Sequence, residues 1–255
     1  MRTALAHCAV WSLVTDSLQR ITDDLNRDLA PLQFGAPVTH VYNPLIYARP
    51  AWDAYCRRYG QGERRVLFVG MNPGPFGMAQ VGVPFGEVSM VRDWLGIEEA
   101  IGQPTPMHPK RPIHGFACAR SEVSGQRFWS WARARYHTPE RFFSQCFVTN
   151  YCPLCFMDAS GANRTPDKLT PAERTALFAA CDRALRRTVE LMHPEFAIGI
   201  GQFAEKRLDI ALAGMPGVRI ARAPHPSPAS PAANAGWPQL MDAALHEAGV
   251  IVPRD

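Results

Sequence analysis

The sequence has no apolar run long enough to cross a membrane. A bilayer span needs about 18 uninterrupted apolar residues, and the opening stretch, MRTALAHCAVW, contains an arginine but no long apolar core or clear cleavage site. The seven cysteines are odd in number and irregularly spaced, which argues against a disulfide framework and for a reducing compartment. We therefore expect a soluble protein that stays in the cytoplasm.

Motifs for metals and nucleotides are also missing. Cys152 and Cys155 form a CxxC pair in CPLC, but no second pair and no histidine cluster at zinc spacing accompanies it. The cysteine spacing does not fit an iron–sulfur cluster, and neither GxxxxGK(S/T) nor GxGxxG occurs. We expect no metal and no cofactor. The loop GMNPGPFG is rich in glycine and could be interpreted as a loop that binds a nucleotide phosphate. The absence of both glycine patterns weakens that interpretation.

Size and composition favour one globular domain. With 255 residues, 47% of them hydrophobic, the chain can bury a single large core. We expect one domain over residues 1–255, with residues 1–34 as an N-terminal helical extension. Lys and Arg number 27 against 23 Asp and Glu, a net charge of +4, which permits a polyanionic partner without requiring one.

Four short, nearly continuous apolar runs predict buried strands: VLFVG from Val66, CFVTN from Cys146, FAIGIG from Phe196 and VRIARA from Val218. Helical patterns occupy residues 11–29, residues 172–192 after the cap Thr170, residues 201–214 and residues 235–248. An aromatic-rich segment, GQRFWSWARARY, is a further helix candidate. Helical crossovers between short buried strands predict an α/β fold with a parallel sheet and helices on both faces.

Polar residues follow three of these strands. Asn72 comes after the first, Asn150 ends the second, and His225 follows the fourth in APHPSPASP. Singly, each is as well explained by turn formation. Together at one edge of a parallel sheet, where ligands bind, they indicate a site that reads a base. An Asn amide matches the N3–H and O4 edge of uracil, and a histidine can donate a hydrogen bond to charge developing on O2.

Three segments carry a closer resemblance: GMNPGPFGMAQVGVPFGEV from Gly70, NYCPLCFM from Asn150 and HPSPASPAAN from His225. They resemble the signature segments of the single-strand-selective monofunctional uracil-DNA glycosylases, and the resemblance covers about residues 35–248. It implies a three-layer αβα sandwich around a four-stranded parallel sheet. It also implies an enzyme that flips uracil out of DNA and hydrolyses its N-glycosidic bond, and that acts in the nucleoid of a bacterium or the nucleus of a eukaryote.

The resemblance assigns catalysis to Asn72 and His225. Asn72 would position the attacking water, and because an amide is no general base near neutral pH, the glycosidic bond would break first. His225 would hydrogen-bond O2 of the departing uracil anion. Asn150 would select the base edge, and Phe85 would stack on the base, although an ordinary core aromatic is the alternative for Phe85.

Met71, Gly74 and Met78 would surround the base near C5. The resemblance implies a space there that holds water and admits oxidised substituents such as hydroxymethyl. Thymine is disfavoured, because its methyl group would displace that water without replacing its hydrogen bonds. No motif places a lysine or terminal amine for a Schiff base, so strand cleavage is not expected.

The segment after His225 would contact DNA. In the family it fills the gap left by the flipped base, usually with a basic residue, and here it consists of Ser227, Pro228, Ala229, Ser230 and Pro231. Since Ala229 has no charge, we expect a preference for single-stranded or mispaired uracil over paired duplex. Phosphate contacts are expected from basic residues of the same rim, with solvated surface as the alternative for each: Lys110, Arg111, Arg120 and Arg222.

We thus expect the partner to be single- and double-stranded DNA that contains uracil. We also expect the protein to be a monomer and not to attach to a membrane. Two alternatives remain open. One is a glycosylase that prefers hypoxanthine or xanthine. The other is a module that binds modified bases without catalysis.

Overall fold

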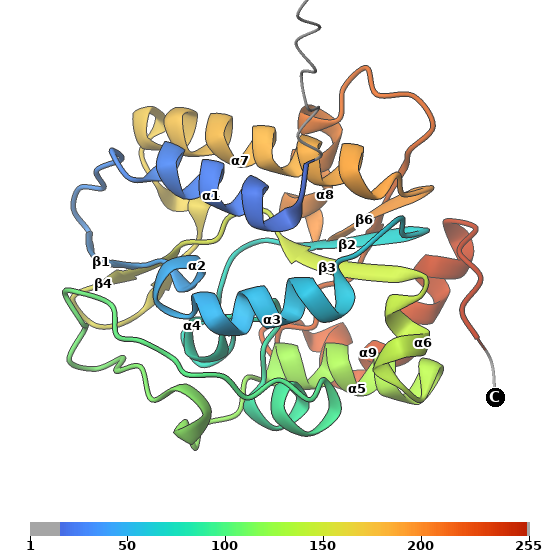
Figure 1. Cartoon of the computed structure of the whole chain (residues 1–255), viewed down its shortest axis with the longest axis horizontal. Helices are drawn as coiled ribbons and strands as arrows, with labels where there is room; N and C mark the ends of the chain where they lie inside the picture. Colours follow the sequence, from blue (N-terminus) through green and yellow to red (C-terminus); the bar gives the residue numbers. More distant parts are fainter. Residues whose placement is uncertain (1–15, 254–255) are drawn as a thin grey trace, which may run out of the picture.

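A four-stranded parallel sheet forms the centre of the protein (Figure 1), seen in a computed structural model that describes residues 16–253. Its order is β3-β2-β6-β7, and the strands are β2 (Val66–Gly70), β3 (Cys146–Asn150), β6 (Phe196–Ile200) and β7 (Arg219–Ala223). All four predicted strands are present, with the last beginning one residue later than expected. The predicted fold class is confirmed.

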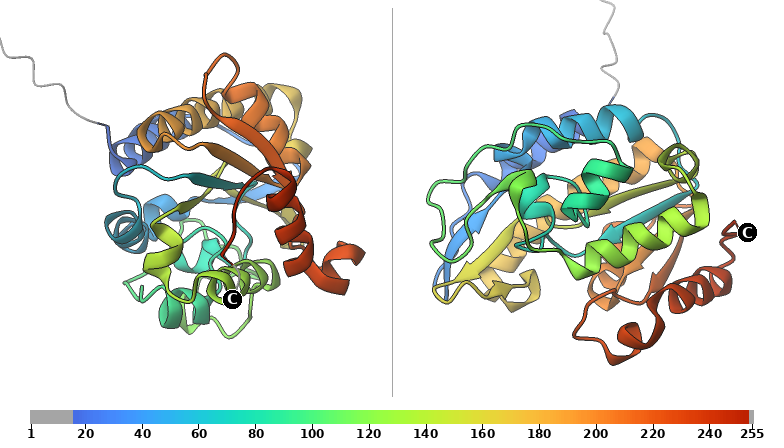
Figure 2. Two further views of the ribbon diagram at one scale, coloured as in Figure 1. Left: turned by 90° about the vertical axis from the view of Figure 1, so that its right-hand side faces the viewer. Right: turned by 90° about the horizontal axis from the view of Figure 1, so that it is seen from below.

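Helices cover both faces of this sheet, as two views at right angles show (Figure 2). One face carries α1 (Leu18–Leu29), α7 (Pro171–Met192) and α8 (Gln202–Ala211). The other carries α3 (Arg49–Tyr59), α5 (Val123–Tyr136), α6 (Pro139–Phe143) and α9 (Pro231–Glu247). Because β2 is covered on both faces, every one of its residues is buried, and this explains why its sequence is a continuous apolar run.

A second, antiparallel sheet was not predicted. It has the order β1-β4-β5 and consists of β1 (Val38–Tyr42), β4 (Cys155–Asp158) and β5 (Asn163–Arg164). Its strands are short, and β1 pairs with a segment more than a hundred residues away in the sequence. No local sequence pattern therefore predicts this sheet. Since β4 follows closely after β3, this sheet lies beside the carboxyl end of the parallel sheet.

Helix boundaries differ from the predictions in three places. Helix α1 begins at Leu18 with Ser17 as its N-cap. The prediction that Asp16 and Ser17 are helical was therefore wrong, and residues 11–15 of the predicted helix lie outside the described residues. Helix α8 ends at Ala211, before Gly214. Helix α9 begins at Pro231, earlier than expected, because Ser230 provides the cap.

The long crossover helix α7 follows its sequence signal closely. The Thr170 side chain accepts from the Glu173 backbone, and Glu173 reaches back to the Thr170 backbone, which completes a capping box. The same face holds α1, whose Asp24 and the preceding Asp16 both accept hydrogen bonds from Arg187 on α7. The expected single domain with an extension at residues 1–34 stays a prediction.

Two short helices, α2 (Pro44–Tyr47) and α4 (Met78–Val81), lie in the connections on either side of β2. Helix α4 begins the segment that follows the loop GMNPGPFG and so places Met78 beside the carboxyl end of the sheet. Within residues 16–253, no helix is long and apolar enough to cross a membrane.

Candidate base-binding and catalytic pocket

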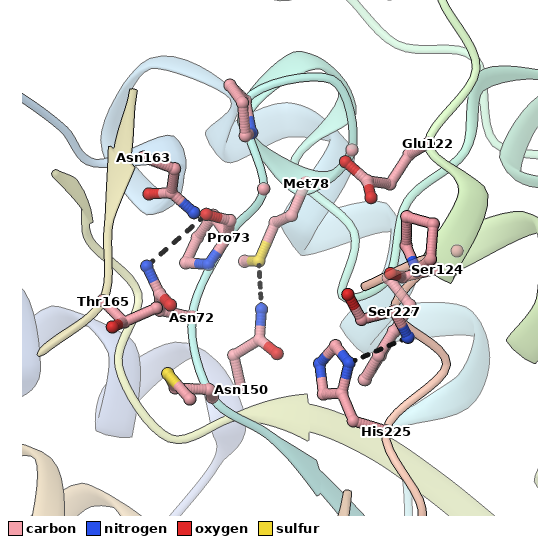
Figure 3. Close-up of a pocket in the computed structure, with 17 residues that line it drawn as sticks. Asn72, Pro73, Met78, Glu122, Ser124, Asn150, Asn163, Thr165, His225 and Ser227 are labelled. Carbon is pink, nitrogen blue, oxygen red and sulfur yellow. Dashed lines mark hydrogen bonds between the residues drawn. The ribbon is translucent and has the colours of Figure 1, made fainter. Parts of the chain in front are cut away.

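The carboxyl ends of β2, β3 and β7 surround one cavity of about 440 Å³ (Figure 3). This position agrees with the general rule that ligands of parallel sheets bind beyond the carboxyl ends, near the point where the strand order reverses. The chain runs from β2 outward to β3 and then returns past β2 to β6. The predicted residues that line the cavity are Met71, Asn72, Gly74, Met78, Phe85, Asn150, His225, Ser227 and Pro228.

Asn72 is held by its amide nitrogen. Nδ2 donates to the Leu154 carbonyl at 3.1 Å, and Leu154 lies in the segment between β3 and β4. This contact uses the donor side of the amide and leaves Oδ1 as an acceptor for a water molecule in the cavity. An amide oxygen fixed in this way can orient water but cannot remove its proton.

Asn150 reaches the cavity because Gly70 has no side chain. The two residues are partners in the parallel register of β2 and β3, and a Cβ on Gly70 would lie 2.3 Å from Asn150 Oδ1 and 2.8 Å from the Phe85 ring. Asn150 Nδ2 points to the Met78 sulfur at 3.2 Å, a weak acceptor with no donor of its own. The amide therefore presents an ordered donor and acceptor pair to the cavity.

Phe85 forms a flat wall of the cavity. Its backbone is left-handed, with φ 51, a conformation that costs a bulky L-residue about 1–2 kcal/mol. The ring stacks on Phe128 of α5 with centroids 4.8 Å apart and planes 16° apart. Phe128 covers one face of the ring, so the half-buried Phe85 is placed to stack on a planar ligand with the other.

His225 faces Phe85 across the cavity, with ring centroids 6.5 Å apart. The Ser227 backbone N–H donates to Nδ1 at 3.1 Å, which makes Nδ1 an acceptor and places the imidazole proton on Nε2. Burial lowers the pKa of His225, so the ring is neutral near pH 7. A neutral imidazole with Nε2–H is a hydrogen-bond donor for an oxygen in the cavity.

Several lining residues escaped the sequence analysis, among them Glu122, Ser124, Asn163 and Thr165. Burial raises the pKa of Glu122, and a Cβ on Gly74 would lie only 2.6 Å from its carboxylate. Glu122 precedes α5, whereas Asn163 and Thr165 come from the region of β5. Only the fold brings these segments to the cavity, and no local pattern marks them.

Comparisons with known proteins agree with this geometry. Residues 57–248 match the Uracil DNA glycosylase superfamily. The chain is 50% identical over 228 residues to the single-strand selective monofunctional uracil-DNA glycosylase of Rattus norvegicus, covering 89% of this chain and 82% of the relative. The Bos taurus protein of the same name is also 50% identical and is covered to 84%.

The chain belongs to this glycosylase family. The predicted family resemblance is thereby confirmed. The crystal structure of Pedobacter heparinus SMUG2 has a similar fold, with a TM-score of 0.64 at 19% identity, covering 89% of this chain and 96% of that one.

The segment predicted to contact DNA, residues 227–231, continues from the cavity into α9. Ser227 and Pro228 line the cavity, and the Ser227 hydroxyl accepts from the backbone of the exposed Ala229 at 3.1 Å. Ser230 caps α9 and Pro231 is its first residue. Arg222 does not line the cavity, and its guanidinium is paired with Glu205 at 3.3 Å.

Basic residues gather on another part of the rim. Phe76 lies between Pro75 and Gly77, both of which line the cavity. The guanidinium carbon of Arg120 lies 4.0 Å from the centre of the Phe76 ring, and that of Arg111 lies 5.3 Å away. The aromatic ring thus holds two positive charges next to a segment that lines the cavity.

Proposed function

We propose that this protein removes uracil from DNA by hydrolysing the N-glycosidic bond and leaves an abasic site. The observation that carries the proposal is the convergence of Asn72, Asn150 and His225 on one cavity with an aromatic wall, Phe85. This set supplies a water-orienting amide, a base-reading amide, an anion-stabilising donor and a stacking surface. Family membership gives the same reaction class independently.

The proposed mechanism is dissociative. The group that orients the water, the Asn72 amide, cannot take its proton, so the glycosidic bond breaks before water attacks, giving a sugar oxocarbenium ion and a uracil anion. His225 donates Nε2–H to O2 as negative charge develops there. The uracil anion has already taken the bonding electrons, so the water held by Asn72 Oδ1 adds to C1′ of the cation and releases a proton, which the uracil anion or solvent takes up.

Base selection rests on Asn150 and on the region around Gly74. The Asn150 amide can pair with N3–H and O4 of uracil, whereas cytosine presents the reverse pattern. We further propose that Gly74 and Met78 leave room for water or for an oxidised C5 substituent such as hydroxymethyl. The Glu122 carboxylate beside Gly74 makes this region polar, which disfavours the thymine methyl group.

DNA reaches the cavity by flipping out one nucleotide, which costs least in single strands or at mismatches. Ser227 lies on one side of the cavity, while Asn163 and Thr165 lie on the other (Figure 3). Arg111 and Arg120 on Phe76 supply positive charge for the phosphates next to the flipped nucleotide. Lys110, which is exposed beside Arg111, extends this charged rim.

The deciding experiment uses oligonucleotides with one uracil, 5-hydroxymethyluracil, hypoxanthine, xanthine or thymine, each single- and double-stranded. The protein is incubated with them without added metal, and alkali-labile sites are scored on gels. We expect labile sites at uracil and hydroxymethyluracil, none at thymine, and strand breaks only after alkali. Excision of hypoxanthine or xanthine above uracil would replace the proposed substrate, and binding without any labile site would indicate a sensor of modified bases.

A further inference from the structure

The loop that carries His225 has few backbone donors of its own. Residues 224–230 read PHPSPAS, and the three prolines lack an N–H. Three side chains instead hold the loop by its proline carbonyls. Trp237 Nε1 donates to Pro224 O at 2.8 Å, Arg127 Nη1 to Pro226 O at 3.0 Å, and Asn234 Nδ2 to Pro228 O at 2.9 Å.

Arg127 is the one charged donor of the three. It lies on α5 and also donates from Nη2 to Asn234 Oδ1 at 2.8 Å, so the guanidinium joins α5, α9 and the loop. Asn234 thereby has its oxygen on Arg127 and its nitrogen on Pro228. The two contacts form a closed network in which each side chain orients the other.

The contact with Pro226 reaches the imidazole through a single peptide group. Pro226 C=O and Ser227 N–H belong to the same planar unit. Its oxygen accepts from the Arg127 guanidinium, and its N–H donates to His225 Nδ1 at 3.1 Å (Figure 3). A positive charge at the carbonyl end polarises the peptide and makes the N–H a stronger donor.

This arrangement determines which nitrogen of His225 carries the proton. A strong N–H donor at Nδ1 requires a lone pair there, so the proton stays on Nε2 and the ring stays neutral. Among the described residues, no acidic side chain is hydrogen-bonded to His225, and the Ser227 N–H donates to its ring. Orientation and tautomer therefore depend on the peptide that Arg127 holds.

Helix α5, which carries Arg127, also positions Phe85 on the opposite wall of the cavity. Gly125 of α5 packs so closely on Phe85 that a Cβ there would lie 2.1 Å from the Phe85 carbonyl oxygen, and Phe128 stacks under the Phe85 ring. Within its first two turns, α5 thus contacts the loop of His225 and the stacking aromatic. The spacing between the two walls is set by one rigid element.

We infer that Arg127 is a positioning residue of this enzyme, which fixes the neutral Nε2–H form and the orientation of His225 through the Pro226–Ser227 peptide. The inference rests on the proposed function for its catalytic consequence. Its consequence for the state of His225 does not depend on activity.

The test compares Arg127→Met, Arg127→Lys and the matched control Arg133→Met. Arg133 is exposed on the same helix, so its replacement removes the same charge away from the loop. Under single-turnover conditions on single-stranded uracil DNA, we expect Arg127→Met to slow excision roughly 10- to 100-fold, as small misplacements of catalytic groups do. Arg127→Lys should fall between Arg127→Met and the parent, because lysine keeps a charged donor but lacks the planar fork that joins Pro226 to Asn234, and the control should match the parent.

Two further readouts separate positioning from other roles. The ¹⁵N chemical shifts of His225 should show Nδ1 unprotonated in the parent, and a mixture of tautomers or a changed pKa in Arg127→Met. In a His225→Ala background, adding Arg127→Met should change the residual rate by less than about 2-fold, since residues that act as a unit are not additive.

Other outcomes would overturn the inference. Weaker DNA binding with an unchanged chemical step, together with a reduced salt dependence, would make Arg127 a phosphate contact. An unchanged His225 spectrum in a folded Arg127→Met protein would show that the peptide contact does not control the ring. If the parent lacks uracil excision, the proposed function fails while the spectra still test the inference.

Discussion

Gly70 and Asn150 lie opposite each other at the carboxyl ends of β2 and β3, and the missing side chain of one makes room for the amide of the other. A Cβ at Gly70 would overlap Asn150 Oδ1 at 2.3 Å, far inside normal contact. The small residue at the end of β2 therefore determines where the Asn150 amide lies, the group proposed to read the base.

Gly70→Ala is expected to reduce uracil excision about 100-fold, because the displaced Asn150 amide no longer meets the base edge. The measurement is kcat/KM on single-stranded uracil DNA, with thermal melting to verify the fold. Gly35→Ala is a matched control, since the nearest atom to its new Cβ would be 3.7 Å away. Full activity in folded Gly70→Ala would contradict the role given to Asn150.

Asn72→Ala is expected to lower the single-turnover rate about 1,000-fold while DNA binding changes little, because the variant removes the acceptor for water and leaves the groups assigned to base binding in place. Excision kinetics and a binding titration on the same oligonucleotide separate the two effects. A loss of binding that parallels the loss of rate, or unfolding of the variant, would return Asn72 to the structural role suggested by its bond to the Leu154 carbonyl.

The pH dependence follows from His225. Burial lowers its pKa below the ordinary value of 6.5, so the rate should be constant near pH 7 and fall only as the pH drops through that lowered pKa. Protonation places a hydrogen on Nδ1, which then opposes the Ser227 N–H.

The stability of the fold should follow the same group. In the unfolded chain the His225 ring takes up a proton near pH 6.5, so its contribution to stability is complete above that pH and declines below it. Rates and melting temperatures measured from pH 5 to pH 8 check both trends, and a rate that rises on acidification would contradict the neutral donor.

We expect the preference for single-stranded over paired DNA to depend on Ala229. Its exposed methyl group cannot fill the space that a flipped base leaves in a duplex, so excision from single-stranded or mispaired DNA should exceed excision from a U·A pair. Ala229→Arg should raise the rate on the paired duplex several-fold and leave the single-stranded rate nearly unchanged. Equal parent rates on the two substrates would contradict this account.

The arginines on Phe76 should contribute through phosphate contacts. Arg120→Met is expected to weaken binding equally for all uracil-containing sequences and to reduce the slope of log K against log salt concentration by about 1. Arg92→Met is a suitable control because Arg92 is only half-buried and is paired with Asp93. An unchanged salt slope would remove Arg120 from the DNA interface.

Much of the central sheet was predictable because its signals are local. The buried run from Val66 and the cap at Thr170 are visible in a few consecutive residues. The antiparallel sheet was not predictable, since the pairing of β1 with β4 depends on contacts between distant segments. The expected monomer and the limits of the domain remain predictions.

Asn72, Asn150 and His225 could be selected from the sequence because each follows a predicted parallel strand, and parallel strands end at a common edge. Glu122 and Arg127 could not be selected, because both lie on or beside a helix whose distance from the cavity is a property of packing. The sequence by itself determined the strands, the class of fold and the polar groups at their ends, because apolar runs, helix caps and strand-end residues are each written in short stretches of chain. The tertiary structure alone decided how Gly70 admits an amide and how Arg127 holds the peptide beside His225, because fractions of an ångström between remote segments arise only when the whole core is packed.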